Sequence, residues 1–171
     1  MIIGFTVNSM SQNVSAEAGV YALIQSSGGI NNGAGIGFLH DMNFGSINIA
    51  GLTNGSGLVV IDPSALSPNT PDLTVPPVYM NNVAVGANSA TIIPASFSVT
   101  GLPTSIIITS SATLKSGTNT IVLNDIKSNK ALITSAVGTK TLYVGGTLNL
   151  VANQAVGSYA SIGDLLVTIA Y

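Results

Sequence analysis

The last eight residues of the chain, DLLVTIAY at 164–171, read as a single β-strand. Alternation with a period of two gives this strand one apolar face, made of Leu165, Val167, Ile169 and Tyr171. The sequence stops there without a polar tail. We therefore expect a core strand whose outer neighbour comes from elsewhere.

The first residues of the chain are a candidate for that neighbour. Residues 1–7, MIIGFTV, place Ile3, Phe5 and Val7 on one face of a strand. A polar, hinge-like stretch follows at 8–13. A strand within the domain's own sheet and a strand given to another molecule fit this pattern equally well.

The sequence between these two ends favours an all-β fold. Helix-forming Glu, Lys and Gln are scarce and Arg is absent, whereas short β-branched runs are broken by Gly, Pro and Asn. The breaks come about every 8–12 residues, a rhythm typical of sandwiches and barrels. We expect strands at 2–7, 19–25, 36–49 (two pieces around His40-Asp41), 57–61, 83–85, 90–100, 105–114, 120–126, 140–151 and 164–171.

The chain is almost uncharged. Its 171 residues carry 4 Lys+Arg and 6 Asp+Glu, with a net charge of −2 and a mean hydropathy of +0.56. An average domain has about 25% charged residues, against 6% here. A length of this order suits one domain, and a net charge near zero favours self-association. Four cations cannot neutralise many phosphates, so the usual nucleic-acid binders are excluded.

Side chains that could carry out chemistry are few and scattered. Without Cys and with one His, the chain has no zinc or disulfide signature. His40 lies beside Asp41, but a hydrolase triad needs three groups that converge in space, and a turn explains the pair. The carboxylates are too widely spaced for a calcium loop. We expect no enzyme activity, no cofactor and no metal.

Several motifs in the second half of the chain occur in a familiar order. Residues 140–150, KTLYVGGTLNL, are followed by ANQAVGSY at 152–159 and by VTIAY at 167–171. Two weaker pieces are MNFGSI at 42–47 and FSVTG at 97–101. Together they resemble a bacterial exported β-domain family of unknown function, related to the spore-coat-U-like pilins of chaperone–usher pathways. The resemblance covers about Val20 to Tyr171.

This resemblance implies an immunoglobulin-like, pilin-type β-sandwich that lacks its last strand. The N-terminal extension of the next subunit would fill the groove beside the C-terminal strand, by donor-strand exchange. A periplasmic chaperone would cap that groove before an usher assembles the fibre. The mapping gives a donor extension at 1–14, a sandwich domain at 15–171, plugs at Ile3, Phe5 and Val7, and an acceptor-groove edge at Leu165, Val167, Ile169 and Tyr171.

The expected function is structural: a subunit of an extracellular pilus or fibre that polymerises head-to-tail by donor-strand complementation. Identical subunits would form a helical homopolymer at the cell surface, serving attachment or biofilm formation. No run of 18 apolar residues predicts a membrane span. No signal peptide is recognised, so a cytosolic protein and the mature form of an exported one both fit. Assembly without an usher also stays open. The alternatives are a monomeric adhesin or carbohydrate-binding β-sandwich, and a viral capsid or decoration protein.

Overall fold

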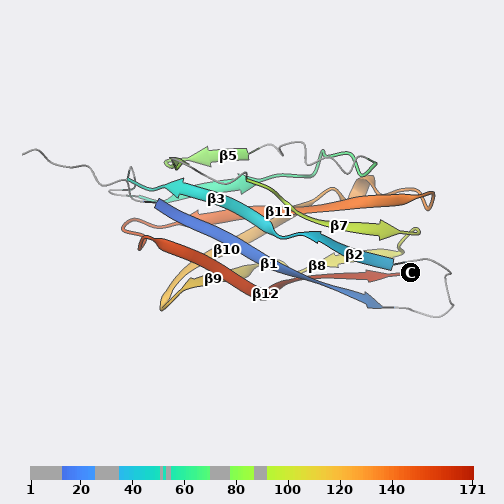
Figure 1. Ribbon diagram of the computed structural model, residues 1–171. Coiled ribbons are helices and arrows are strands. Elements are labelled where there is room, and N and C mark those ends of the chain that lie inside the picture. The colour runs from blue at the N-terminus through green and yellow to red at the C-terminus, as the bar shows by residue number, and fades with distance from the viewer. Residues whose placement is uncertain (1–12, 26–34, 51, 53–54, 70–77, 87–91) are drawn as a thin grey trace, which may run out of the picture.

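The computed structural model describes residues 13–25, 35–50, 52, 55–69, 78–86 and 92–171, with the backbone alone for 13–25 and 162–164. This part of the chain is all-β, as the strand pattern of the sequence predicts (Figure 1). The one helical element in it is a single 3-10 turn, Lys130–Leu132. No helix in these residues is long and apolar enough to cross a membrane.

Twelve strands make up the described fold. They are β1 Asn13–Gln25, β2 Gly35–His40, β3 Met42–Asn48, β4 Gly57–Ile61, β5 Val78–Asn81, β6 Ala84–Val85, β7 Ala95–Thr100, β8 Ser105–Ile108, β9 Ala112–Ser116, β10 Asn119–Ser128, β11 Thr139–Leu150 and β12 Gly157–Ala170. The predicted division at His40-Asp41 is confirmed, and β4 has the predicted bounds. β5 was missed, and β12 begins seven residues before the predicted Asp164. The predicted strand at 2–7 lies outside the described residues.

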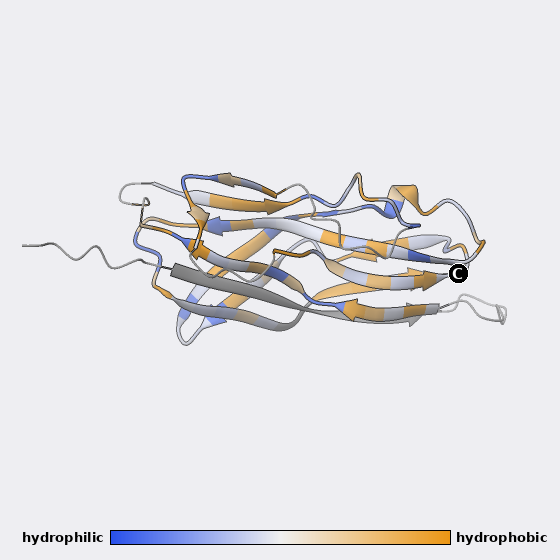
Figure 2. Ribbon diagram, turned by 45° about the horizontal axis from the view of Figure 1, so that its top comes forward, coloured by the Kyte–Doolittle hydropathy of each residue, from blue (hydrophilic) through white to orange (hydrophobic). Residues whose placement is uncertain are grey.

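The strands form one hydrogen-bonded network that curls around an apolar core. Its order is β2-β7-β11-β10-β9-β12-β1-β3-β6, while β4 joins β11 to β5 and β8 pairs with β12. The apolar and polar residues alternate along the strands in Figure 2. In β4, for example, Gly57, Val59 and Ile61 are buried and the residues between them are half-buried. In β4, period-two alternation therefore decides which face enters the core.

β11 is the strand that connects most of the network. Along one edge it pairs with β10, and along the other it pairs first with β7 and then with β4. Gly145 and Gly146 lie where the partner changes. A Cβ at Gly145 would collide with the backbone carbonyl oxygen of Ile61 and lie 2.7 Å from Pro63 Cδ. The Val-Gly-Gly-Thr-Leu motif thus provides the close backbone approach that this junction requires.

A buried asparagine holds the segment that follows β4 against strand β11. Asn129 is fully buried, and its Nδ2 donates to the carbonyl oxygens of Leu66, at 3.1 Å, and Thr141, at 3.0 Å. Its Oδ1 accepts from the backbone N–H of Tyr143 at 2.8 Å. One side chain thereby satisfies three backbone groups.

The Asn-Gln and Gly-x-Tyr motifs meet in a second buried contact. Gln154 Nε2 donates to the hydroxyl oxygen of Tyr159 at 2.9 Å, and that hydroxyl donates to the carbonyl oxygen of Ala155 at 2.7 Å. Tyr159 is 1% exposed, so its hydroxyl needs these partners. The contact fixes the turn between β11 and β12.

The described fold is elongated and has two ends, here called its poles (Figure 1). At the C-terminal pole β12 ends, the carbonyl oxygen of Ala170 accepts from the Thr104 N–H, and Thr100 pairs with both Gly35 and Thr139. At the opposite pole β12 begins at Gly157. β11 ends there as well, and residues 151–156 connect the two strands. Figure 1 shows β1 and β12 running side by side toward the end marked C.

Candidate functional site

The predicted acceptor residues lie in the core of the same chain. Leu165, Val167 and Ile169 are each 0% exposed. Tyr171 is partly buried, and its hydroxyl donates to the carbonyl oxygen of Gly35 at 2.8 Å. The alternation predicted for this strand therefore holds. The predicted plugs Ile3, Phe5 and Val7 lie outside the described residues.

Both backbone edges of β12 are paired within the chain. On one side, β1 runs parallel to it from Val14, opposite Gly157, to Gln25, opposite Ala170. On the other side, β8 pairs antiparallel with Val167–Ala170, and Lys115 of β9 lies opposite Ala160. The neighbour of the C-terminal strand is therefore β1, a segment near the N-terminus. The predicted boundary between residues 14 and 15 falls inside this strand.

β1 has a second partner on its other edge. Residues 13–18 pair antiparallel with β3, from Asn13 opposite Asn48 to Ala18 opposite Met42. β1 thus fills a place in the sheet that is flanked by β3 and β12, which we call the β1 position. Beyond residue 18 the β3 pairing ends. Without β1, two backbone edges would be unpaired, one along Gly157–Ala170 and one along Met42–Asn48.

The second half of β1 is paired on one side alone. Residues 20–25 pair with Leu165–Ala170, and no other strand of the described residues pairs with them. β2, which precedes β3 in the chain, pairs with β7 instead. This part of β1 is held to the domain by one row of backbone hydrogen bonds, as expected for a strand at an edge.

Tyr171 links the end of β12 to the start of β2, so its ionisation is linked to stability. Burial raises the pKa of the Tyr171 hydroxyl above its ordinary value near 10.0. The neutral Tyr171 hydroxyl therefore contributes its full stabilisation below about pH 10, and this contribution is lost as the pH rises through the raised pKa of the folded protein. We expect Tyr171→Phe to lose about 0.5–1.5 kcal/mol at pH 7 and to show less alkaline destabilisation than the wild type.

Urea unfolding between pH 7 and pH 11 checks this expectation. Tyr79→Phe is the control, because Tyr79 lies on β5 and is 60% exposed. Equal loss of stability above pH 10 in the wild type and in Tyr171→Phe would contradict the buried-hydroxyl account.

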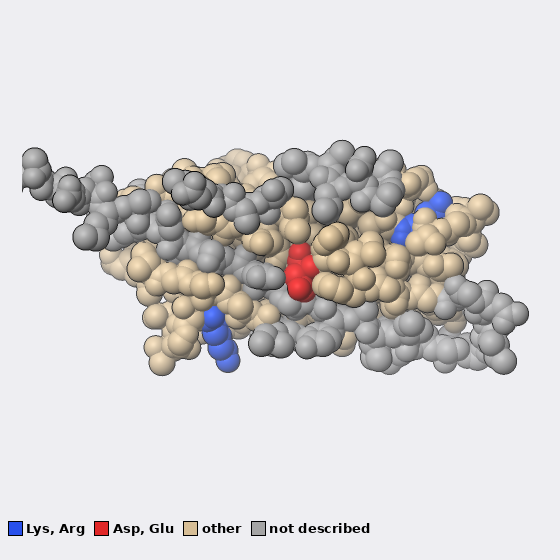
Figure 3. All heavy atoms as spheres, viewed as in Figure 1, with Lys and Arg blue, Asp and Glu red and all other residues tan. Residues whose placement is uncertain are grey.

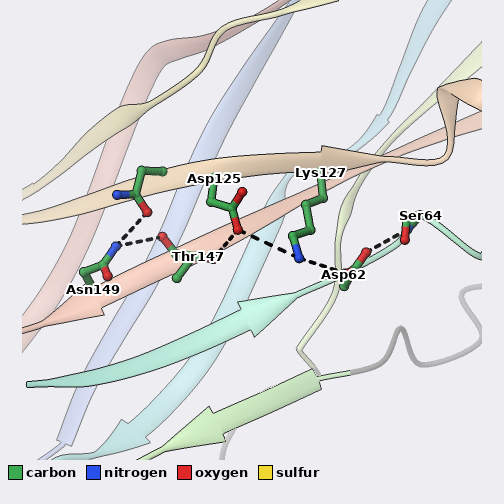
Figure 4. A network of polar contacts seen from close by, with 7 residues as sticks. Asp62, Ser64, Asp125, Lys127, Thr147 and Asn149 are labelled. Atoms are coloured by element: carbon green, nitrogen blue, oxygen red, sulfur yellow. Dashed lines mark hydrogen bonds and ion pairs between the residues drawn. The ribbon is translucent and has the colours of Figure 1, made fainter.

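A polar network between β4, β10 and β11 is the main group of charges in the described residues (Figure 4). Lys127 Nζ lies 3.1 Å from Asp62 Oδ2 and 3.8 Å from Asp125 Oδ2. Hydrogen bonds from Ser64, with help from Lys127, hold the pKa of Asp62 below its ordinary value, and Asp62 raises the pKa of Lys127. Both groups therefore stay charged at neutral pH. The two side chains therefore form an ion pair.

The remaining candidates for chemistry do not converge. His40 ends β2 and is exposed. In the described part of the chain, no three His, Cys, Asp or Glu side chains lie where they could hold a metal ion. The face in Figure 3 shows isolated Lys and Asp side chains on a surface made largely of other residue types. The arrangement that stands out is thus the pairing of β1.

A match to one protein family covers most of the chain. A protein-family model matches residues 37–171, which leaves all of β1 before the matched part. No curated protein and no solved structure matches the chain. Because the match spans well over half of the sequence, the chain belongs to the family described as Domain of unknown function (DUF4402).

Proposed function

We propose that this protein is a structural subunit of an extracellular pilus or fibre that polymerises by exchanging its N-terminal strand with neighbouring copies. The observation that carries the proposal is the β1 position. A strand from outside the family-matched region fills it, between β3 and the last strand of the domain. An equivalent strand from a second copy can fill the same position.

The strand order supports a pilin-type, immunoglobulin-like sandwich. β7 pairs with β2 and β11, and β12 pairs with β8 and β9. In a pilin-type reading, the exchangeable member of this arrangement is the strand between β3 and β12, which is the place that β1 takes. The exchanged segment would then comprise residues 1–25, so that the predicted donor extension at 1–14 overlaps the first residues of β1.

Physical chemistry favours exchange at this position. Strand addition supplies backbone hydrogen bonds for affinity, and alternate side chains supply register and specificity. Nine residues, 26–34, separate β1 from β2, and an extended chain of that length spans about 30 Å. A chaperone strand would use the same two edges before assembly.

A reversible disulfide tests whether β1 must leave its position. Ser15 lies opposite Ser158 in the β1–β12 register, and the chain has no Cys of its own. Neighbouring strands are about 4.8 Å apart, within the Cα–Cα span that a disulfide needs. We expect the oxidised Ser15→Cys/Ser158→Cys variant to stay monomeric. After reduction it should form filaments like the wild type, as seen by electron microscopy.

The two single-cysteine variants are the controls. They cannot form the disulfide between β1 and β12, so they should polymerise under oxidising and reducing conditions alike. Filaments that form equally well from the oxidised double variant would refute strand exchange. A wild-type chain that remains monomeric at all concentrations would refute the fibre proposal, and binding of that monomer to a glycan would then favour the carbohydrate-binding alternative.

A further inference from the structure

The peptide bond between Asp62 and Pro63 directly follows strand β4 and is the only Asp-Pro bond in the sequence. It is a tertiary amide, whose nitrogen leaves as a secondary amine once it has taken up a proton. The aspartate carboxylate can attack the carbonyl carbon of this same bond and close a cyclic anhydride. Well-oriented groups within one molecule react with effective concentrations of about 10⁵–10⁸ M. The fate of this bond therefore depends on how the fold holds the Asp62 carboxylate.

The fold holds that carboxylate from two sides. The Ser64 N–H donates to Asp62 Oδ1 at 3.1 Å, and Lys127 Nζ lies 3.1 Å from Oδ2. The first contact is that of an Asx turn, which folds the side chain back along the backbone of residues 62–64. Figure 4 shows Lys127 pointing toward Asp62, with Ser64 on the other side of the carboxylate. A nucleophile and an ammonium group are thus held together at the start of this turn.

Lys127 reaches Asp62 across strand β11, because a glycine stands between them. β11 lies between β10 and β4, and Lys127 of β10 is opposite Gly145. A Cβ on Gly145 would lie 2.7 Å from Pro63 Cδ. Strands two places apart in a sheet are about 10 Å apart, and a side chain on the middle strand would stand in that gap. The Val-Gly-Gly-Thr-Leu motif therefore leaves the path from the lysine to the aspartate open.

Both groups carry the charge that a reaction at this bond would use. They are ionised at neutral pH, so the carboxylate can act as a nucleophile and the ammonium can give a proton to a leaving amine. Asp125 Oδ2 lies 3.8 Å from Lys127 Nζ and accepts from Thr147 Oγ1 at 3.4 Å. Asp125 therefore keeps the lysine in place when Asp62 loses its charge.

We infer that this protein cuts its own chain between Asp62 and Pro63 and joins the Asp62 side chain to Lys127 through an amide bond. In the first step the Asp62 carboxylate attacks its own backbone carbonyl carbon, and the C–N bond to Pro63 breaks. The Lys127 ammonium supplies the proton that the Pro63 nitrogen takes up. This step leaves a cyclic anhydride on Asp62 and a neutral amine on Lys127.

In the second step the Lys127 amine attacks Asp62 Cγ. An amide forms between Nζ and Cγ, and the anhydride opens to release the α-carboxylate of Asp62. The proton lost by Nζ goes to the Pro63 nitrogen, which becomes a charged chain end. One amide is broken and one is formed, so the mass and the net charge of the protein do not change. The product ties the end of β4 to β10 across β11, and it does not depend on the proposed fibre function.

Intact mass, a denaturing gel and peptide mapping of the full-length protein, kept at neutral pH, test this reaction. We expect one band of unchanged mass, a second N-terminus that begins at Pro63, and a peptide containing Lys127 linked to a peptide that ends in Asp62. The bond between Ser67 and Pro68 is an internal control, because it is a tertiary amide without a preceding carboxylate. It should stay intact.

Three variants separate the two steps. Lys127→Arg keeps the positive charge but loses the amine, so any chain that it cuts should gain the mass of one water and separate into fragments 1–62 and 63–171. Asp125→Asn should raise the share of this hydrolysed product relative to the cross-linked one. Pro63→Ala replaces the tertiary amide by a poorer leaving group and should give neither product.

Lys130→Arg is the matched control, since Lys130 is exposed and donates to the carbonyl oxygen of Ile106 instead. It should form the cross-link at the wild-type level, and an unchanged melting temperature before the reaction shows that each variant folds. A wild-type chain with no new N-terminus and no linked peptide would overturn the inference. So would a wild-type chain that separates into two fragments, because water and not Lys127 would then have opened the anhydride.

Discussion

Replacing Asn129 with alanine is expected to lower the free energy of unfolding by about 3–4 kcal/mol. The side chain is fully buried and satisfies the carbonyl oxygens of Leu66 and Thr141 and the N–H of Tyr143. Alanine leaves these three backbone groups without their partner. An unsatisfied buried group costs about 1–3 kcal/mol, which exceeds the net gain from making an ordinary hydrogen bond.

Urea denaturation measures this effect, provided that the dependence of the unfolding free energy on urea concentration is the same in the variant and the wild type. Asn124→Ala is the matched control, because Asn124 is exposed on β10 and its Oδ1 accepts from Asn149 Nδ2 at 2.8 Å. The same chemical change at an exposed site should cost less than about 1 kcal/mol. If both variants lose the same stability, Asn129 has no special structural role.

Gly145→Ala is expected to destabilise the protein by about 1–3 kcal/mol. The new Cβ would overlap the backbone carbonyl oxygen of Ile61 and approach Pro63 Cδ to 2.7 Å. A carbonyl group in the β4–β11 pairing cannot rotate away, so the two strands must separate. The change in thermal midpoint and in urea midpoint reports this loss.

The neighbouring glycines give a graded comparison. At Gly146 the new Cβ would contact the side-chain tips of Ile126 at 2.9 Å and Leu123 at 3.0 Å, which can shift, and would lie 3.1 Å from the backbone carbonyl oxygen of Asn124. At Gly55 it would meet nothing within 4 Å. We therefore expect Gly145→Ala to cost most, Gly146→Ala less, and Gly55→Ala nothing. A Gly145→Ala variant as stable as Gly55→Ala would contradict the close approach.

The strands could be predicted because their signal is local. Alternation in β4 and in the last residues of β12 follows from the period of an extended chain, and the burial of Val59, Leu165 and Val167 agrees with it. β5 was missed because Val78–Asn81 is short and follows a proline-rich stretch. Among the described residues it pairs with β4 alone, so its strand state depends on a partner distant in the sequence.

The sequence around the buried polar residue Asn129 contains no pattern that predicts its burial. Asn129 stands in the sequence SNK, which reads as a solvated turn. Its burial arises because the connection after β4 folds over β11, where Pro68 also accepts from the Thr141 N–H at 2.7 Å. No local pattern reports which of several asparagines will be covered by a segment about 60 residues away.

The sequence by itself determined that this protein is a sparsely charged β-protein whose C-terminal residues form a strand with an apolar face, because composition and alternation are local properties. The tertiary structure alone decided what lies beside that strand. Alternation fits a parallel or an antiparallel neighbour equally well, and it fits residues 1–14 as readily as residues 13–25. β1 lies between β3 and β12 and pairs with both, which only the folded chain reveals. The proposed exchange of strands between copies depends on that placement.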